Sequence, residues 1–258
     1  MRELLADLVS ERDQLRSMLA DATEDVFDRM TPAEPWTIRD QISHLAFFDT
    51  EATKAARSSD EFSEALTVMA EIGPEAYMQQ HIARGRAMTA GELMAWLTDA
   101  ETSMVAELSN RDPDDRLPWY GPPMRASSFV TARLMETWAH GQDIADALGV
   151  RREPTDRLFA VAELGIRTFS FSFRNRGLDV PDERVRVALR GPTGTVRVWN
   201  DESDASVTGP LEDFCLVVTQ RRHLDDTHLV LEGALAEEWM SIAQAFAGPP
   251  GPGRQPLG

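Results

Sequence analysis

The chain has 258 residues, enough for two modest domains with buried cores. It carries 43 acidic and 26 basic residues, and the formal net charge of -17 would repel phosphate backbones, so we expect neither nucleic acid nor an anionic membrane as a partner. The N-terminal residues lack the apolar core of a signal peptide, and no later run reaches membrane-spanning length, which predicts a cytoplasmic protein.

The first segment has the spacing of an amphipathic helix up to about residue 20, with leucines at Leu4, Leu8, Leu15 and Leu19. Two prolines interrupt this pattern before Trp36. Thr37 then occupies an N-cap position, and Asp40 stands three residues later, where it can complete a capping box. These residues predict a second helix, which carries His44 beside its apolar face.

Two further helical segments follow. Residues 60–88 have helical spacing with a break at Gly73. Thr89 and Glu92 form a second capping box, which opens a helix that extends to about residue 108. Residues 110–126 contain four prolines, and they are therefore predicted to form an irregular connection.

A fourth long helix is predicted from about Ser127 to Gly149, where the glycine suits the position just after a helix end. Polar residues recur at steps of three or four along one face of this helix. We call this set the polar stripe: Arg133, Glu136, His140 and Asp143. Glu136 and His140 lie one turn apart and are candidate metal ligands. A solvated helix face is the alternative interpretation, because such pairs are common on exposed helices.

A third metal ligand must come from another helix, and His44 is the best candidate. The remaining histidines have no partner at ligand spacing: His81, His223 and His228. Two helices that present His44, Glu136 and His140 would form a ligand set with open positions for water or substrate, as a catalytic metal requires. Four helices joined by proline-marked connections predict an antiparallel bundle, and in bundles such sites are built from facing helices.

From residue 151 onward the pattern becomes that of a small α+β domain. Residues 155–175 fit a helix or a strand equally well, because TFSFSF alternates with period two. Two alternating segments around a GPTG turn at residues 191–194 predict a hairpin. Pro210 suits the first position of a helix with Glu212 and Asp213 in its first turn and Arg221 and Arg222 in its last, which would match the helix dipole at both ends.

Cys215 is the only cysteine, which excludes an internal disulfide and a cysteine-rich zinc site. Its apolar neighbours predict a buried core thiol and not a nucleophile. A strand around Val230 and a helix around Trp239 complete this half, and residues 248–258 are predicted to be disordered. The expected domains are therefore residues 1–150 and 151–247, followed by this tail.

The segments PWTIRDQISHLAFFD and ETWAHGQDIADALG resemble the paired signatures of DinB-like metal-binding bundles, specifically the N-terminal domain of mycothiol-dependent maleylpyruvate isomerases. In that family a Trp-Thr/Ser-hydrophobic-Arg-Asp run leads to the first histidine, and a Glu-x-x-x-His-x-x-Asp run follows later. The likeness covers about residues 1–150, and the second half resembles the family's sterol-carrier-like C-terminal domain. The segments WYGPPMRASSF and SIAQAFAGPPGPGR resemble an actinobacterial branch of this family.

The resemblance implies a divalent metal, most often zinc, held by His44, Glu136 and His140, with Asp143 as a supporting carboxylate. It also implies thiol-dependent chemistry, because a metal with an open position can bind a thiol and lower its pKa. Mycothiol is the implied cosubstrate. In the isomerases the thiol adds to a conjugated double bond, the adduct rotates, and elimination releases the trans isomer.

Other candidate residues have two interpretations each. Asp40 either orients His44 or only caps its helix, and Arg133 either acts in the site or pairs with Glu136 one turn away. Trp119 and Tyr120 form either the rim of a cofactor pocket or a packed connector. The full set comprises three catalytic candidates and three cofactor-binding candidates: Asp40, Asp143 and Arg133, then Trp119, Tyr120 and Arg125.

We therefore expect a metal-dependent enzyme, a monomer or homodimer, that uses mycothiol as an S-transferase or isomerase on a small electrophilic metabolite. One alternative is a hydrolase in which the same ligands activate water. The other is a protein without catalytic activity that binds a metal and, in its second domain, an apolar ligand.

Overall fold

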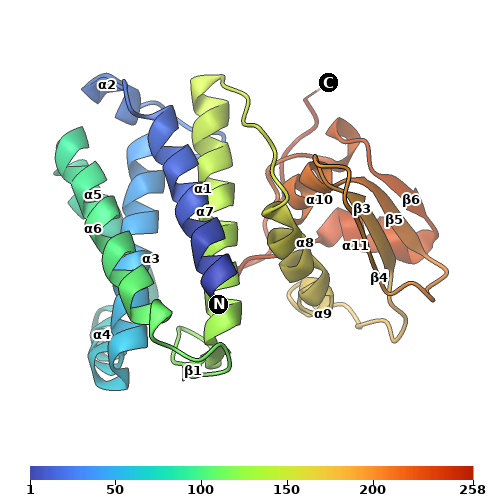
Figure 1. Cartoon of the computed structure of the whole chain (residues 1–258), viewed down its shortest axis with the longest axis horizontal. Helices are drawn as coiled ribbons and strands as arrows, with labels where there is room; N and C mark the ends of the chain where they lie inside the picture. Colours follow the sequence, from blue (N-terminus) through green and yellow to red (C-terminus); the bar gives the residue numbers. More distant parts are fainter. Residues whose placement is uncertain (258) are drawn as a thin grey trace. The chain divides into compact units, whose positions relative to one another are not determined.

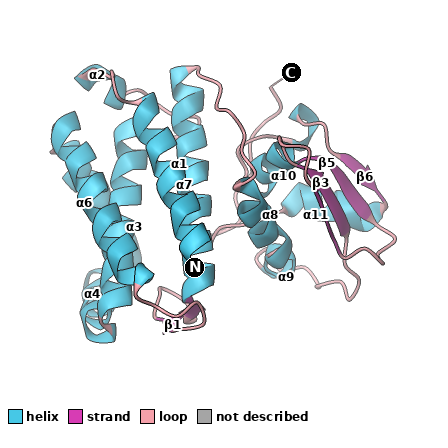
Figure 2. Cartoon of the chain, viewed as in Figure 1, coloured by secondary structure: helices cyan, strands magenta, loops and turns pink. Residues whose placement is uncertain are grey.

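The computed structural model describes residues 1–257, except for the side chains of Ser59 and Met78, and it divides into two compact units (Figure 1). The first unit is Met1–Arg151, and the second begins at Arg152. Figure 2 shows that the first is built almost entirely of helices and that the second combines helices with a sheet. The predicted fold class, a helical bundle followed by an α+β unit, is confirmed.

Four long helices form the bundle of the first unit: α1 (Arg2–Met18), α3 (Ile38–Arg57), α6 (Ala90–Ser109) and α7 (Ala126–Leu148). The shorter elements of this unit are α2 (Glu24–Phe27), α4 (Ser59–Ile72), α5 (Pro74–Arg86), β1 (Arg116–Leu117) and β2 (Met124–Arg125). Helix α3 packs against α5, α6 and α7, and α1 packs against α7. As a result, α3 and α7 face each other inside the bundle.

The helix ends follow the predicted local signals. Thr37 and Asp40 form a reciprocal capping box at the start of α3, and Thr89 and Glu92 form another at the start of α6. Helix α7 ends at Gly149, whose φ of 67° is the left-handed conformation that favours glycine. Because these caps depend on a few adjacent residues, the sequence predicts them well.

The bundle core joins apolar faces of α1, α3, α6 and α7. Its fully buried members include Leu15, Ile42, Leu45, Leu97 and Ile144. Burying a side chain of this size stabilises the fold by about 1.5–3 kcal/mol. The core therefore holds α3 and α7 in a fixed relation, which the site described below requires.

A buried ion triad also links the bundle helices. The Asp49 carboxylate on α3 accepts hydrogen bonds from Arg12 on α1 and from Arg133 on α7, the latter at 2.9 Å from Nε. Both ion pairs are almost fully shielded from solvent. The predicted pairing of Arg133 with Glu136 is therefore wrong, because the guanidinium group turns towards the carboxylate of the facing helix.

The second unit contains a four-stranded sheet with the strand order β4-β3-β5-β6. Its elements are α8 (Leu158–Arg167), α9 (Phe169–Arg174), β3 (Arg186–Arg190), β4 (Val196–Trp199), β5 (Ser206–Pro210), α10 (Leu211–Val218), the 3-10 helix η1 (Leu224–Asp226), β6 (Val230–Glu232) and α11 (Ala234–Ile242). The hairpin around the GPTG turn is confirmed as β3 and β4. Residues 158–174 are helical, which settles the ambiguity of TFSFSF.

Strand β5 was not predicted, and it pairs in parallel with β3 at the centre of the sheet. Helix α10 starts one residue after Pro210, which is its N-cap, and it ends at Val218. Glu212 and Asp213 lie in its first turn, so the expected match to the helix dipole is confirmed at this end. Gln220 follows the helix with a φ of 60°, so Arg221 and Arg222 lie beyond it and the expected match at the C-terminal end is wrong. Cys215 is fully buried, as predicted, and its thiol donates to the Leu158 carbonyl.

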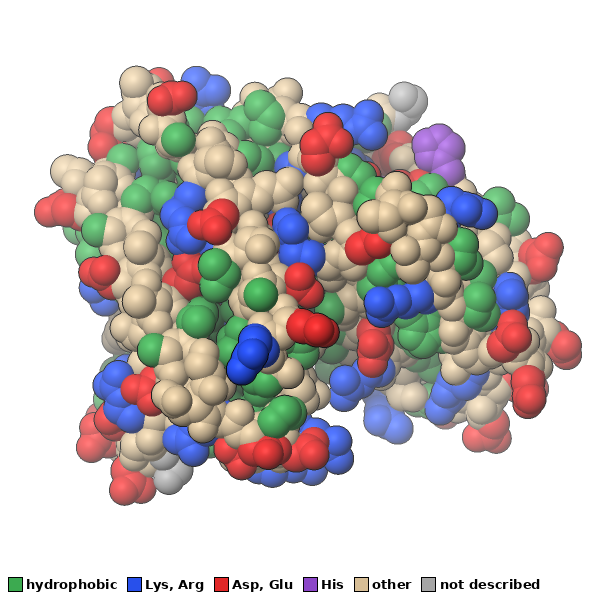
Figure 3. Space-filling view, in the orientation of Figure 1, with side chains coloured by type: hydrophobic (Ala, Val, Ile, Leu, Met, Phe, Trp, Pro, Cys, Tyr) green, Lys and Arg blue, Asp and Glu red, His purple; other side chains and the backbone are tan. Residues whose placement is uncertain are grey.

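Residues 248–257 contain no helix or strand, and backbone and side-chain hydrogen bonds connect them to Asn175, Arg176 and Asp226. Disorder of this tail stays a prediction. None of the described helices has the length and apolar character needed to cross a membrane. Acidic and basic side chains are mixed over the face in Figure 3, and no continuous basic patch is seen on it.

Candidate metal centre

The two facing helices bring the three predicted ligands together. His44 comes from α3, and Glu136 and His140 come from α7; one ligand atom of each lies within 4.8 Å of the others. No other trio of His, Cys, Asp or Glu in residues 1–257 has this geometry. His140 is 7% exposed and Asp143 is fully buried, so the polar stripe faces the bundle interior and not solvent.

The ligand distances suit a small metal ion. His140 Nε2 lies 3.1 Å from Glu136 Oε2, and His44 Nε2 lies 3.6 Å from the same oxygen. Two ligand atoms at about 2.0–2.1 Å from a tetrahedral metal are about 3.3 Å apart. The two distances from Glu136 are therefore close to the spacing of two ligands on one divalent cation.

The protonation states of the trio also suit a metal. Burial and, to a smaller extent, the neighbouring His140 lower the pKa of His44 to about 3, although Glu136 opposes both effects. Burial alone raises the pKa of Glu136, but the His140 and His44 rings beside its carboxylate outweigh burial and keep this pKa well below its usual value. Near neutral pH the His44 ring is therefore uncharged and Glu136 is ionised, as metal ligands must be.

Gln41 fixes the orientation of His140, and sequence reasoning missed it. Its amide oxygen contacts His140 Nδ1, and its amide nitrogen donates to Thr31 Oγ1 at 2.9 Å. Because the amide oxygen can only accept, Nδ1 carries the ring proton and the Nε2 lone pair points towards Glu136. The available signal was position, since Gln41 precedes His44 by three residues on the same helix face.

Replacing Gln41 by leucine is expected to weaken metal binding by about 10- to 100-fold, because the ring of His140 loses the group that holds its tautomer. Competition with a chromogenic chelator measures this affinity. Gln41→Glu is the matched control, since a carboxylate oxygen still accepts from Nδ1. Equal affinity in the wild type and both variants would contradict the role of Gln41.

Asp40 does not contact His44. Its carboxylate accepts from the Thr37 backbone N–H at 3.0 Å and from Arg86 at 2.8 and 2.9 Å. The capping interpretation therefore holds, and the predicted role in orienting His44 is not realised. Asp143 is buried on α7 and lies about one turn after His140.

Arg125 and Arg133 do not reach the trio. Arg125 is 61% exposed and pairs with Asp114 at 3.1 Å, at the start of α7. With a rise of about 1.5 Å per residue, it lies about 16 Å along the helix from Glu136. Arg133 is engaged by Asp49 in the buried triad. Neither guanidinium is thus placed to contact a ligand of the trio.

Aromatic side chains wall the trio on the α3 side. Trp36 stacks on His140 with ring centroids 5.8 Å apart, and Phe48 lies 4.5 Å from His44. Trp119 and Tyr120 contact Phe48 at 6.0 and 5.9 Å, so their loop packs behind this wall. The loop that carries Trp119 and Tyr120 thus borders the trio without supplying a side chain to it.

The Tyr120 hydroxyl donates to Glu51 at 2.8 Å, and Tyr77 donates to the same carboxylate at 3.1 Å. Burial raises the pKa of both phenols, so they stay protonated. Glu51 also lines a cavity of about 460 Å³ between α3, α4 and α5, together with Phe47, Lys54, Glu61, Glu64, Ala65, Val68, Tyr77 and Gln80. Polar hydroxyl, amide and carboxylate groups make this cavity suitable for a hydrogen-bonding ligand.

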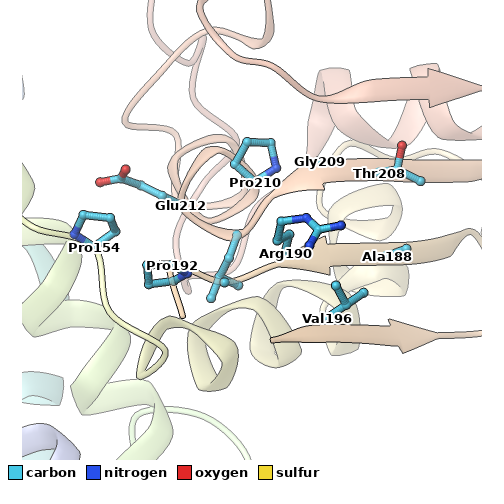
Figure 4. Close-up of a pocket in the computed structure, with 11 residues that line it drawn as sticks. Pro154, Ala188, Arg190, Pro192, Val196, Thr208, Gly209, Pro210 and Glu212 are labelled. Carbon is cyan, nitrogen blue, oxygen red and sulfur yellow. The ribbon is translucent and has the colours of Figure 1, made fainter. Parts of the chain in front are cut away.

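A second cavity, of about 590 Å³, belongs to the second unit. Figure 4 shows Ala188, Val196 and Thr208 on neighbouring strands beside it, with Pro154 and Pro210 near Glu212. Its lining contains no histidine or cysteine, and none of the predicted site residues. The sterol-carrier-like character of this unit stays a prediction.

Comparison with known proteins shows likeness to a protein family, to a relative known from two strains, and to solved structures. The mycothiol maleylpyruvate isomerase N-terminal domain matches residues 8–145. An uncharacterized protein of Mycobacterium tuberculosis, from two strains, is 42% identical over 251 residues, which is 97% of both chains.

Among solved structures, the crystal structure of the mycothiol-dependent maleylpyruvate isomerase superposes with a TM-score of 0.61 at 16% identity, covering 88% of this chain and 92% of that one. A histidine-to-alanine mutant of that enzyme superposes with a TM-score of 0.62 at 15% identity and the same coverage. At this identity the two structures establish a shared fold.

Proposed function

The chain belongs to the mycothiol maleylpyruvate isomerase family, and from this premise we propose that it is a metal-dependent enzyme that uses mycothiol as a thiol cosubstrate. Its reaction would be an isomerisation or thiol transfer on a small electrophilic metabolite. The observation that carries the proposal is the inward-facing trio of His44, Glu136 and His140, whose ring orientation and protonation suit metal binding. A divalent metal, with zinc as the first candidate, would be held by these three residues.

When bound there, such a metal supplies a Lewis acid that favours the deprotonated form of a thiol. The protein groups support this chemistry in separate ways. As ligands, two imidazoles and one carboxylate would contribute one negative charge against the two positive charges of the metal, so the site would keep a net positive charge that attracts an anionic sulfur. Trp36 and Phe48 keep bulk water from the His44 side of the trio, and Gln41 holds the orientation of the His140 ring.

The chemistry proposed for isomerisation balances without a further reagent. The thiol first loses its proton to solvent, and the thiolate sulfur forms a bond to one carbon of a conjugated cis double bond while the π electrons move onto the conjugated carbonyl. The former double bond is then single and rotates. Reversal of the electron flow breaks the carbon–sulfur bond and releases the trans product with the thiol. In a thiol transfer, protonation of the adduct carbon would end the reaction instead.

The proposal is tested on purified protein by elemental analysis and by calorimetric titration with mycothiol. We expect about one divalent metal per chain and mycothiol binding that chelator treatment abolishes and metal addition restores. Mycothiol with a methylated sulfur is the matched control ligand, and it should bind at least about tenfold more weakly, because it cannot become a thiolate.

Other outcomes would redirect or overturn the proposal. Metal content without thiol binding would favour a hydrolase that activates water with the same residues. Protein that holds no metal, even after reconstitution, would overturn metal dependence and leave the trio as a buried polar cluster.

A further inference from the structure

His81 lies beside the trio, although its neighbours in sequence gave it no ligand spacing. It is on α5 and is 2% exposed. Its ring stacks on Phe47 with centroids 5.1 Å apart, and it lies 5.5 Å from the His44 ring and 6.3 Å from Trp36. His81 has no partner at ligand spacing in the sequence, and tertiary packing alone brings it close to His44.

A close helix contact holds His81 in this place. A Cβ at Gly85 of α5 would lie 1.6 Å from the Ser43 hydroxyl oxygen of α3, so only glycine permits the two helices to approach this closely. Gly85 lies one turn after His81, and Ser43 directly precedes His44. The two imidazoles are thus fixed against each other by backbone packing.

Both ring nitrogens of His81 are buried, and neither has a hydrogen-bond partner among the side chains and backbone groups described. Leaving a buried polar group unpaired costs about 1–3 kcal/mol per group, and native proteins seldom retain one without a reason. His81 is also outside the trio of mutually close ligand atoms. Its nitrogens are therefore available to a molecule that binds beside the metal ligands.

The chemistry of the ring indicates what kind of group His81 would meet. An imidazole carries at least one N–H donor in either protonation state. An N–H group buried beside the trio is satisfied by an acceptor oxygen of a bound molecule.

We propose that His81 is a binding residue of the site, and that it donates a hydrogen bond to an oxygen of the ligand bound beside the trio. This inference rests on the proposed function. It adds that the ligand presents an oxygen on the α5 side of the centre. That oxygen belongs either to the thiol cosubstrate or to the electrophile.

The test compares wild type with His81→Phe, in which a ring of similar size keeps the stacking on Phe47 but has no nitrogen. His228→Phe is the control, because His228 is 89% exposed and belongs to the second unit. Metal-loaded proteins are titrated calorimetrically with mycothiol and, without thiol, with dimethyl maleate as an uncharged electrophile and with maleate as its dianion. Metal content and melting temperature are measured for each protein.

We expect His81→Phe to keep its metal, to melt at a temperature no lower than that of wild type, and to lose about tenfold in affinity for the ligand that carries the oxygen. Weaker mycothiol binding assigns the oxygen to the thiol. Weaker binding of dimethyl maleate or maleate assigns it to the electrophile.

Unchanged affinity for mycothiol and for both electrophiles in His81→Phe would overturn the proposal. An equal loss of affinity in His228→Phe would overturn it as well. Failure of the proposed function is separate from these outcomes. It would be seen in wild type alone, as absence of metal or of any mycothiol binding.

Discussion

Replacing Asp49 by asparagine is expected to destabilise the protein by about 3–5 kcal/mol, because Arg12 and Arg133 would remain buried without a counter-charge. This is a large fraction of the about 5–15 kcal/mol by which a domain is stable. Asparagine keeps the shape of the side chain, so the loss would report charge and not a cavity. Urea denaturation, with the midpoint and slope compared to wild type, measures the change in the free energy of unfolding.

Asp114→Asn is the matched control for this prediction. Asp114 also pairs with an arginine, Arg125, but both side chains are more than half exposed, and such pairs contribute at most about 1 kcal/mol. A second test restores the balance without charge, with leucine at Asp49 and methionine at Arg12 and Arg133. This triple replacement should recover most of the lost stability, since apolar packing replaces the buried ions. A fully stable Asp49→Asn would show that the triad does not hold the bundle together.

The triad also bears on the metal centre. Asp49 lies five residues after His44 on α3, and Arg133 lies three residues before Glu136 on α7. The ion pair between them therefore ties the two helices within about one to one and a half turns of the trio. A variant that keeps its fold but loosens this pair should bind metal more weakly than wild type.

The helices of the first unit could be predicted because their signals are local. Leucine spacing, the capping boxes at Thr37 and Thr89 and the C-terminal Gly149 each depend on residues within a few positions. Strand β5 could not be predicted in this way. It ends in Gly209 and Pro210, two residues that usually break strands, and it is stabilised by parallel pairing with β3 about 20 residues earlier in the chain.

The same difference between local signals and long-range contacts applies to the candidate site. The three candidate ligands follow from helical spacing together with the family resemblance, since Glu136 and His140 share one helix face. Gln41 was missed because a neutral amide belongs to no ligand pattern, and its role arises only when α3 faces α7. Arg133 was misassigned to Glu136 because spacing along one helix cannot reveal a buried carboxylate on another.

Replacing His140 by alanine is expected to have the largest effect on function. The variant loses one of three ligands, and Glu136 loses its 3.1 Å partner, so metal content should fall from about one per chain to a small fraction. Lewis-acid assistance is worth several kcal/mol, so turnover of any thiol-dependent substrate should fall by about a thousandfold or more. Mycothiol binding should disappear together with the metal.

Elemental analysis, calorimetry with mycothiol and single-turnover assays on the same preparation check these three expectations. His223→Ala is the control, because His223 is partly exposed in the second unit and caps a short 3-10 helix. His44→Ala should behave like His140→Ala, whereas Gln41→Leu should show an intermediate loss, because it disturbs the orientation of a ligand and not its presence. Normal metal content in His140→Ala would mean that other residues hold the metal, and the proposed centre would then be wrong.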